Sequence, residues 1–140
     1  MKTIVCGVDG SPSARAAVRV AAHLAEAIDA RLVGLHVLDR LVDEDRTAER
    51  VADHVLSDEV PHVGAEARGE VGDVAERLAA VARDEEPTLI VLGARSRGRS
   101  RTHLRARCAA ELAELTSVPV LVAPPQRAGS SRAACAVRSQ

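Results

Sequence analysis

The chain of 140 residues contains no phenylalanine, no tryptophan and no tyrosine. Without aromatic rings it offers no platform on which a base or a sugar can stack, so single-stranded nucleic-acid and carbohydrate-binding modules are disfavoured. A formal net charge of -1 likewise provides no overall attraction to nucleic acid or to an acidic membrane surface. With this length and these absences, we expect a single domain whose function depends on short motifs.

The sequence also lacks paired cysteines and long hydrophobic runs. Cys6, Cys108 and Cys135 are odd in number and have no CxxC spacing, a pattern typical of neither a disulfide framework nor a zinc site. No apolar stretch is long enough for a secretory signal or a membrane-spanning helix. We therefore expect a cytoplasmic protein with no bound metal, in which Cys6 is a small buried hydrophobic residue.

Apolar residues make up 46% of the chain and occur in short continuous runs separated by amphipathic segments. Runs that are apolar at consecutive positions predict strands buried on both faces, and apolar residues three or four positions apart predict helices between them. The pattern predicts five strands, at residues 3–8, 31–38, 61–71, 88–92 and 118–123, which alternate with four helices, at about residues 12–28, 47–56, 73–86 and 104–115.

This alternation is typical of an α/β domain with a doubly wound, five-stranded parallel sheet and helices on both faces. Local signals support two of the helix starts. Ser11 is suited to an N-cap before Pro12, and Asp73 with Glu76 forms a capping-box pattern. After residue 125 no apolar period continues, so residues 126–140 are predicted to form a flexible C-terminal tail.

Five segments carry a resemblance to a known family. They are IVCGVDGS at residues 4–11, LHVLD at 35–39, Gly72-Asp73 before a helix, LIVLG at 89–93 and VPVLVAP at 118–124. In this order and spacing they resemble the universal stress protein family over residues 1–125. The resemblance implies a Rossmann-like fold of the adenine nucleotide alpha hydrolase type. It also implies a cytoplasmic, usually dimeric stress-response protein, in a family with members that bind ATP and members that do not.

The ATP site of the family can be carried over position by position. The resemblance places Asp9 and Val37 near the adenine and Gly93 near the ribose and phosphates. Such positions converge in a parallel sheet, because ligands bind at the carboxyl ends of the strands. From the residues alone, the carboxylate of Asp9 either hydrogen-bonds a ligand or caps the following helix. We interpret His36 as a packed or hydrogen-bonded core residue, since no partner nucleophile stands at motif spacing.

The phosphate cradle departs from the family pattern. The family has a glycine, two residues, a second glycine, nine residues, and a third glycine followed by serine or threonine. After Gly93 this chain has Ser96, Ala106 and Arg107 at the three later positions. Glycine allows backbone N–H groups to approach a phosphate closely, which a side chain hinders. Arg107, expected in the first turn of the last helix, either fills the phosphate position or binds an anion together with Arg95 at the mouth of the crevice.

Arginine is concentrated around this cradle. These residues either bind a phosphate or an acidic protein surface, or they form a solvated basic loop. A nucleic-acid role is disfavoured, because the rest of the chain offsets the charge. The six arginines are Arg95, Arg97, Arg99, Arg101, Arg105 and Arg107.

Two functional hypotheses follow. The first is a non-catalytic stress-response regulator, a homodimer that contacts unidentified proteins and has weak or absent ATP binding. The second is an ATP-binding switch, with Mg and slow hydrolysis. Outright catalysis has little support, because paired carboxylates and the HExxH, GxSxG and GxxxxGK[ST] patterns are missing. We expect the homodimer to form through the last strand, which the resemblance places at the sheet edge and which has no charge over residues 118–123.

Overall fold

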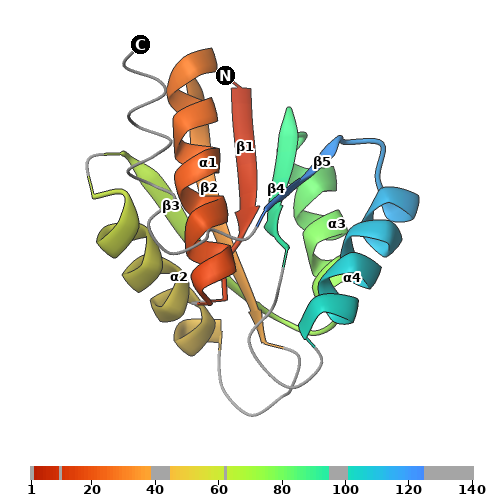
Figure 1. The fold of residues 1–140 in the computed structure, drawn as a ribbon. Coiled ribbons are helices and arrows are strands. Elements are labelled where there is room, and N and C mark those ends of the chain that lie inside the picture. Colours follow the sequence, from red (N-terminus) through yellow and green to blue (C-terminus); the bar gives the residue numbers. More distant parts are fainter. Residues whose placement is uncertain (1, 10, 39–44, 62, 95–100, 125–140) are drawn as a thin grey trace.

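The computed structural model describes residues 2–9, 11–38, 45–61, 63–94 and 101–124, with the backbone alone for residues 45–47 and 101–107. Within these residues five strands alternate with four helices, as the sequence predicts (Figure 1). The elements are β1 (Lys2–Gly7), α1 (Pro12–Ile28), β2 (Ala30–Leu38), α2 (Asp45–Glu59), β3 (Ala65–Val71), α3 (Val74–Glu85), β4 (Leu89–Gly93), α4 (Arg101–Leu115) and β5 (Val120–Ala123).

The strands form one parallel sheet in the order β3-β2-β1-β4-β5. The chain winds from β1 outward to β3, then crosses back and continues through β4 to β5 on the other side. Helices α1 and α2 cover one face of the sheet, and α3 and α4 cover the other. This is the predicted doubly wound α/β architecture, and the direction of winding reverses between β1 and β4.

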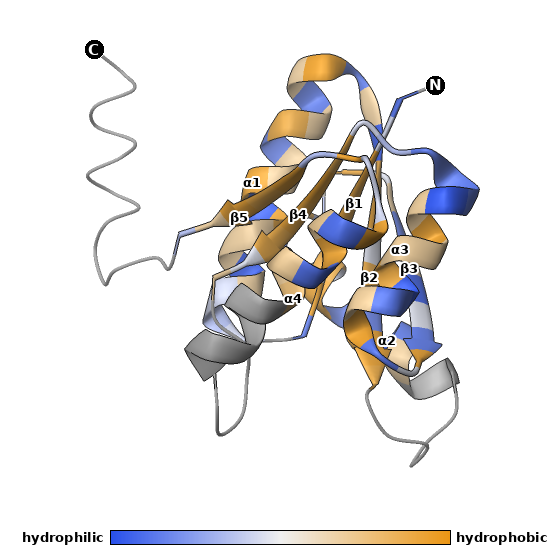
Figure 2. Ribbon diagram, turned by 90° about the vertical axis from the view of Figure 1, so that its right-hand side faces the viewer, coloured by the Kyte–Doolittle hydropathy of each residue, from blue (hydrophilic) through white to orange (hydrophobic). Residues whose placement is uncertain are grey.

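The core consists of two apolar layers separated by the sheet. In the central strand β1, Ile4 and Cys6 pack under α1 and α2, whereas Val5 packs under α3 and α4. Figure 2 shows the apolar residues gathered along the strands, with hydrophilic residues on the outward faces of the helices. Cys6 is fully buried, as predicted.

Capping side chains start two of the helices at the predicted places. The hydroxyl Oγ of Ser11 accepts a hydrogen bond from the N–H of Ala14 at 3.1 Å, with Pro12 at the first position of α1. The carboxylate of Asp73 accepts a hydrogen bond from the N–H of Glu76 at 3.1 Å at the start of α3. Both N-caps satisfy backbone donors that would otherwise lack a partner within the helix.

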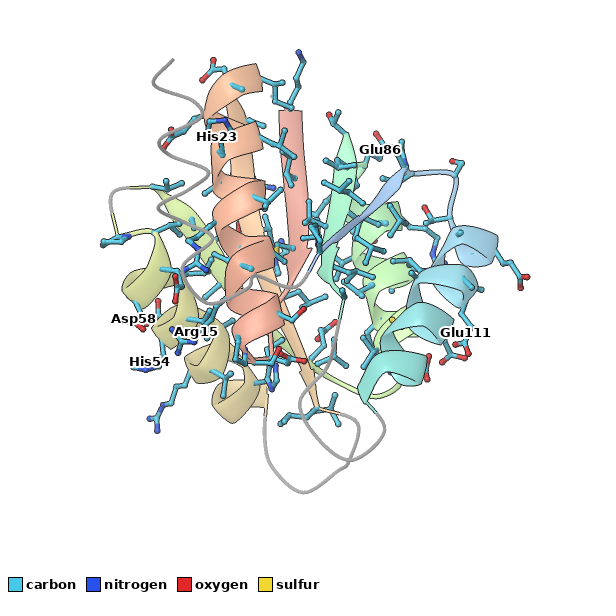
Figure 3. All side chains as sticks on the ribbon, in the orientation of Figure 1. Arg15, His23, His54, Asp58, Glu86 and Glu111 are labelled. Carbon is cyan, nitrogen blue, oxygen red and sulfur yellow. The ribbon has the colours of Figure 1, made fainter. Side chains whose placement is uncertain are left out.

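Ion pairs join α1 to α2, the two helices that cover one face of the sheet, on their solvent side. The guanidinium of Arg15 donates to Asp58 at 2.6 Å and to Glu59 at 2.9 Å (Figure 3). The hydrogen bonds to Glu59 and Asp58 raise the pKa of Arg15 above its ordinary value, so this side chain stays positively charged.

Two strand starts differ from the sequence-based expectation by two residues or more. β3 begins at Ala65 and not at Pro61, because α2 continues to Glu59 and a proline commonly follows a helix end. β5 begins at Val120, two residues later than expected, and includes no proline. The predicted tail at residues 126–140, which contains Cys135, lies outside the described residues.

The last helix begins three residues earlier than predicted, at Arg101. The prediction relied on the apolar period, which starts at Leu104, but arginine is a good helix former and extends the helix ahead of that period. Among the described residues, no helix combines the length and the apolar character that a bilayer crossing needs.

Candidate functional site

Three of the predicted site positions lie at the ends of neighbouring strands. Asp9 follows β1, Val37 is the penultimate residue of β2, and Gly93 is the last residue of β4. Because β2, β1 and β4 are adjacent and parallel, their carboxyl ends share one edge of the sheet. Asp9 and Gly93 stand on either side of the place where the winding reverses, which is the usual ligand position in such sheets.

Asp9 supports the turn that leads into α1. Its Oδ1 accepts a hydrogen bond from the N–H of Ser11 at 2.9 Å, and Ser11 in turn caps the helix. Of the two roles that the sequence left open, capping of α1 belongs to Ser11 and not to Asp9, whose carboxylate instead supports the turn before the helix. The ligand role of Asp9 stays a prediction.

Gly93 lies directly against the first turn of α1. A Cβ atom at this position would be 2.8 Å from the carbonyl carbon of Ser13 and 2.9 Å from the nitrogen of Ala14, closer than such atoms approach. The glycine therefore allows the end of β4 to touch the N-terminus of α1, whether or not a ligand binds. Sequence reasoning assigned Gly93 to the phosphates and missed this packing role, as well as the burial of Ser13 beside it.

Val37 and His36 lie on opposite faces of β2. Val37 is half-buried and packs against the apolar layer under α3 and α4. His36 is only 9% exposed, and its Nδ1 is hydrogen-bonded to the backbone carbonyl of Val8. The interpretation of His36 as a hydrogen-bonded core residue is confirmed. The signal for it was the absence of a partner nucleophile at motif spacing, and the sequence did not indicate which carbonyl the histidine binds.

The structure leaves the remaining predicted positions untested as ligand contacts. Arg95 and Ser96 lie outside the described part of the chain. Because α4 begins at Arg101, both Ala106 and Arg107 fall in its second turn, so the expectation of Arg107 in the first turn is wrong. Backbone N–H groups in a second turn bond to carbonyls four residues earlier and are not directed at a ligand.

The described residues at this edge combine a carboxylate, buried hydroxyls and a helix N-terminus. Ser11 is 4% and Ser13 is 6% exposed, and both belong to the start of α1. The N-terminal end of a helix carries a partial positive charge, while the carboxylate of Asp9 accepts hydrogen bonds. These groups offer polar contacts at the edge of the sheet where ligands usually bind.

Comparisons with known proteins agree with this fold. The family model described as universal stress protein family matches residues 1–124. A solved universal stress protein in complex with cAMP is 25% identical, with a TM-score of 0.67, and the match covers 89% of this chain and 98% of that chain. A universal stress protein family member from Burkholderia pseudomallei is 28% identical, with a TM-score of 0.62 and coverage of 89% and 96%.

A third solved structure, a universal stress protein from Archaeoglobus fulgidus DSM 4304, is 21% identical with a TM-score of 0.69. That match covers 91% of this chain but 45% of the other, so this chain corresponds to about half of that protein. A comparison with curated proteins found no match.

Proposed function

The chain belongs to the universal stress protein family, and we propose that within this family it is a non-catalytic stress-response regulator. It acts in the cytoplasm as a homodimer that contacts other proteins, and its ATP binding is weak or absent. The observation that carries this proposal is the apolar edge of the sheet at β5.

β5 is the terminal strand of the sheet and exposes large apolar side chains. Leu121 is 37% and Val122 is 43% exposed, and Leu115 at the end of α4 is 46% exposed. Leu121 lies opposite Val91 and Val122 opposite Leu92, so the two exposed side chains point to opposite faces. Figure 2 shows the apolar colour continuing along β5 to the edge. An uncharged apolar edge is an aggregation hazard, which a second copy of the same strand removes by pairing with it.

Weak ATP binding is supported by the departures in the phosphate cradle. Ser96, Ala106 and Arg107 stand where the family has two glycines and a hydroxyl residue. The second-turn position of residues 106 and 107 also commits their N–H groups to hydrogen bonds within α4. Each charge-assisted hydrogen bond lost contributes roughly 1.5–3 kcal/mol, so affinity falls by about tenfold or more for each one.

A second candidate function is a nucleotide-dependent switch, with slow ATP hydrolysis. One observation favours it: the 25% identical neighbour is a complex with cAMP. In addition, this chain keeps Asp9, Val37 and Gly93 at adjacent strand ends. A single-phosphate ligand needs fewer of the cradle positions that this chain has replaced.

Light scattering of the purified full chain tests the dimer. We expect a dimer for the wild type and a monomer or an aggregate for Val122→Lys, which places a charge on the exposed edge. The matched control is Ser57→Lys on the exposed surface of α2, which should stay dimeric. A wild type that is monomeric at high concentration would contradict the dimer proposal.

Calorimetric titration of nucleotide-free protein separates the two candidate functions. For the regulator we expect no measurable heat with ATP-Mg, or an affinity weaker than micromolar. Sub-micromolar ATP binding, or ATP that copurifies with the protein, would favour the switch. Titration with cAMP in parallel shows whether a single-phosphate nucleotide is preferred.

A further inference from the structure

One buried histidine joins the ends of β1 and β2 beyond their last paired residues. The register of the two strands ends at the pair Gly7 and Leu35. Past this pair, the N–H of Val8 still donates to the carbonyl of Leu35 at 2.8 Å, and the carbonyl of Val8 is bound by the side chain of His36. His36 therefore supplies, from its side chain, a hydrogen bond at the place where strand pairing stops.

This contact fixes the proton on one nitrogen of the imidazole ring. A carbonyl oxygen only accepts hydrogen bonds, so the Nδ1 atom of His36 must carry the proton and donate it. Val8 is 2% exposed, which means that its carbonyl has little access to water. If the imidazole were removed, a buried acceptor would lose the partner that the structure shows, and leaving such a group unpaired is costly.

The hydrogen-bonded connection continues from Val8 into the start of α1. Asp9 follows Val8 directly, its carboxylate accepts the N–H of Ser11, and Ser11 caps α1 by accepting the N–H of Ala14. The peptide that His36 holds is thus the peptide that precedes Asp9. A rotation of that peptide would move the Asp9 carboxylate and the N-terminus of α1 together.

We propose that His36 is a positioning residue for the ligand site at this sheet edge. Through the carbonyl of Val8 it holds Asp9, and with it the first turn of α1, in the orientation that an adenine nucleotide requires. This inference rests on the second candidate function, because it concerns the nucleotide site of that candidate. His36 itself does not touch the ligand in this proposal.

Two variants separate the hydrogen bond from the bulk of the side chain. His36→Leu keeps an apolar side chain of similar size but has no donor, whereas His36→Asn places an amide N–H near the position of Nδ1. The control is Val60→Ala, which removes buried volume from the same apolar layer after the end of α2. Val60→Ala should lower the stability without acting on the Asp9 turn.

The first measurement needs no ligand. In amide hydrogen exchange, His36→Leu should speed exchange at the N–H groups of Ser11 and Ala14 by about tenfold relative to the N–H of Glu76. The N–H of Glu76 is the reference because it donates to the N-cap of α3, away from the Asp9 turn. His36→Asn should restore the protection, and Val60→Ala should leave the ratio unchanged. In the wild type, a two-bond ¹⁵N–¹H spectrum should show the tautomer protonated at Nδ1. Equal acceleration at all three amides, or protonation at Nε2 alone, would overturn the proposal.

The second measurement is titration with cAMP. We expect His36→Leu to weaken the affinity about tenfold, while His36→Asn and Val60→Ala stay close to the wild type. A His36→Leu variant that binds cAMP as tightly as the wild type would overturn the positioning role. A wild type that binds no cAMP would contradict the second candidate function, and the exchange measurement would then decide alone whether His36 holds the turn.

Discussion

At the scale of single residues, Gly93 is required by packing in the absence of any ligand. The family resemblance explains this glycine by the close approach of a phosphate. The structure gives an independent reason, because the backbone of Ser13 and Ala14 occupies the space that a side chain would need. A phosphate cradle and the packing of α1 against β4 therefore both require glycine at this position, and a stability measurement can isolate the packing requirement.

We expect Gly93→Ala to lower the free energy of unfolding by about 1–3 kcal/mol, because the added methyl group meets backbone atoms that cannot rotate away. The matched control is Gly64→Ala, since no atom lies within 4 Å of a Cβ at that exposed position. There the stability should stay unchanged or rise by up to about 1 kcal/mol. Urea unfolding measures both variants, and equal stabilities for the two would contradict the packing role of Gly93.

Some residue-scale features were predictable from the sequence, and others were not. The N-caps Ser11 and Asp73 were predicted correctly, because a capping side chain acts on a backbone only two or three residues away. The hydrogen bond from His36 to Val8 joins positions 28 residues apart in the chain. No local pattern encodes such a pairing, since it depends on the register between two strands.

At the scale of elements, the residue that caps the C-terminal end of α3 has a backbone conformation that disfavours a side chain. Glu86 has φ 47° and ψ 55°, the left-handed conformation, and its N–H donates to the carbonyl of Ala82. A side chain in this conformation is strained, and glycine is the usual residue at such a helix end. The end of the helix is thus held by hydrogen bonding and packing against the intrinsic preference of the residue.

Glu86→Gly should therefore raise the free energy of unfolding by roughly 0.5–1 kcal/mol, after allowance for the greater freedom of glycine in the unfolded chain. Ala110→Gly, at an exposed position inside α4, serves as the opposite control and should lower stability by about 1 kcal/mol. Thermal unfolding compares the two. A loss of stability in Glu86→Gly would show that its side chain makes contacts worth more than the strain.

β3 was the least regular strand in the sequence, and its environment explains why. Ala65 and Ala67 pack on the side of α2, whereas Glu66 and Arg68 alternate with them on the other face. On that face the guanidinium of Arg68 donates to Glu66 at 2.9 Å and also pairs with Glu85 of α3. Small alanines and paired charges give weak hydrophobic alternation, which is why the sequence pattern defined this strand poorly although it pairs with β2 along its full length.

Glu66 and Glu85 each contact both arginines of this cluster, Arg31 and Arg68, and Glu85 is the less exposed of the two carboxylates. The hydrogen bond to Glu66 raises the pKa of Arg68 above its ordinary value, so Arg68 keeps its charge. We expect Glu85→Gln to lower the free energy of unfolding by about 1 kcal/mol at low salt, and by less in 1 M salt, where the charges are screened. Glu111→Gln, on the exposed surface of α4, is the control (Figure 3). A loss that is equal at both salt concentrations would argue against a charge effect.

At the scale of the whole molecule, the sequence predicted the architecture because each strand and helix has its own apolar period. The order β3-β2-β1-β4-β5 is the one that doubly wound sheets commonly adopt, with crossover connections between neighbouring parallel strands. The site was less predictable. Asp9, Val37 and Gly93 do meet at one edge, but the start of α4 was misplaced, because charged residues ahead of the apolar period gave no signal for it.

The replaced cradle positions provide the most direct test of function for the whole protein. If Ser96, Ala106 and Arg107 are what weakens ATP binding, returning them to the family pattern by Ser96→Gly, Ala106→Gly and Arg107→Ser should raise ATP affinity. Each hydrogen bond regained to a phosphate should contribute about tenfold or more. Calorimetric titration with ATP-Mg measures the change, and unfolding in urea verifies that the triple variant is folded.

A second variant makes this result specific to the proposed site. Adding Asp9→Asn to the triple variant alters the carboxylate at the neighbouring strand end and should remove much of the gained affinity, since the ligand would lose a charged acceptor next to α1. A fall in affinity in the triple variant itself would show that the guanidinium of Arg107 contacts the phosphate in the wild type. An affinity equal to that of the wild type would contradict the cradle explanation, and the arginines at residues 95–107 would then be better tested as a surface that binds acidic proteins.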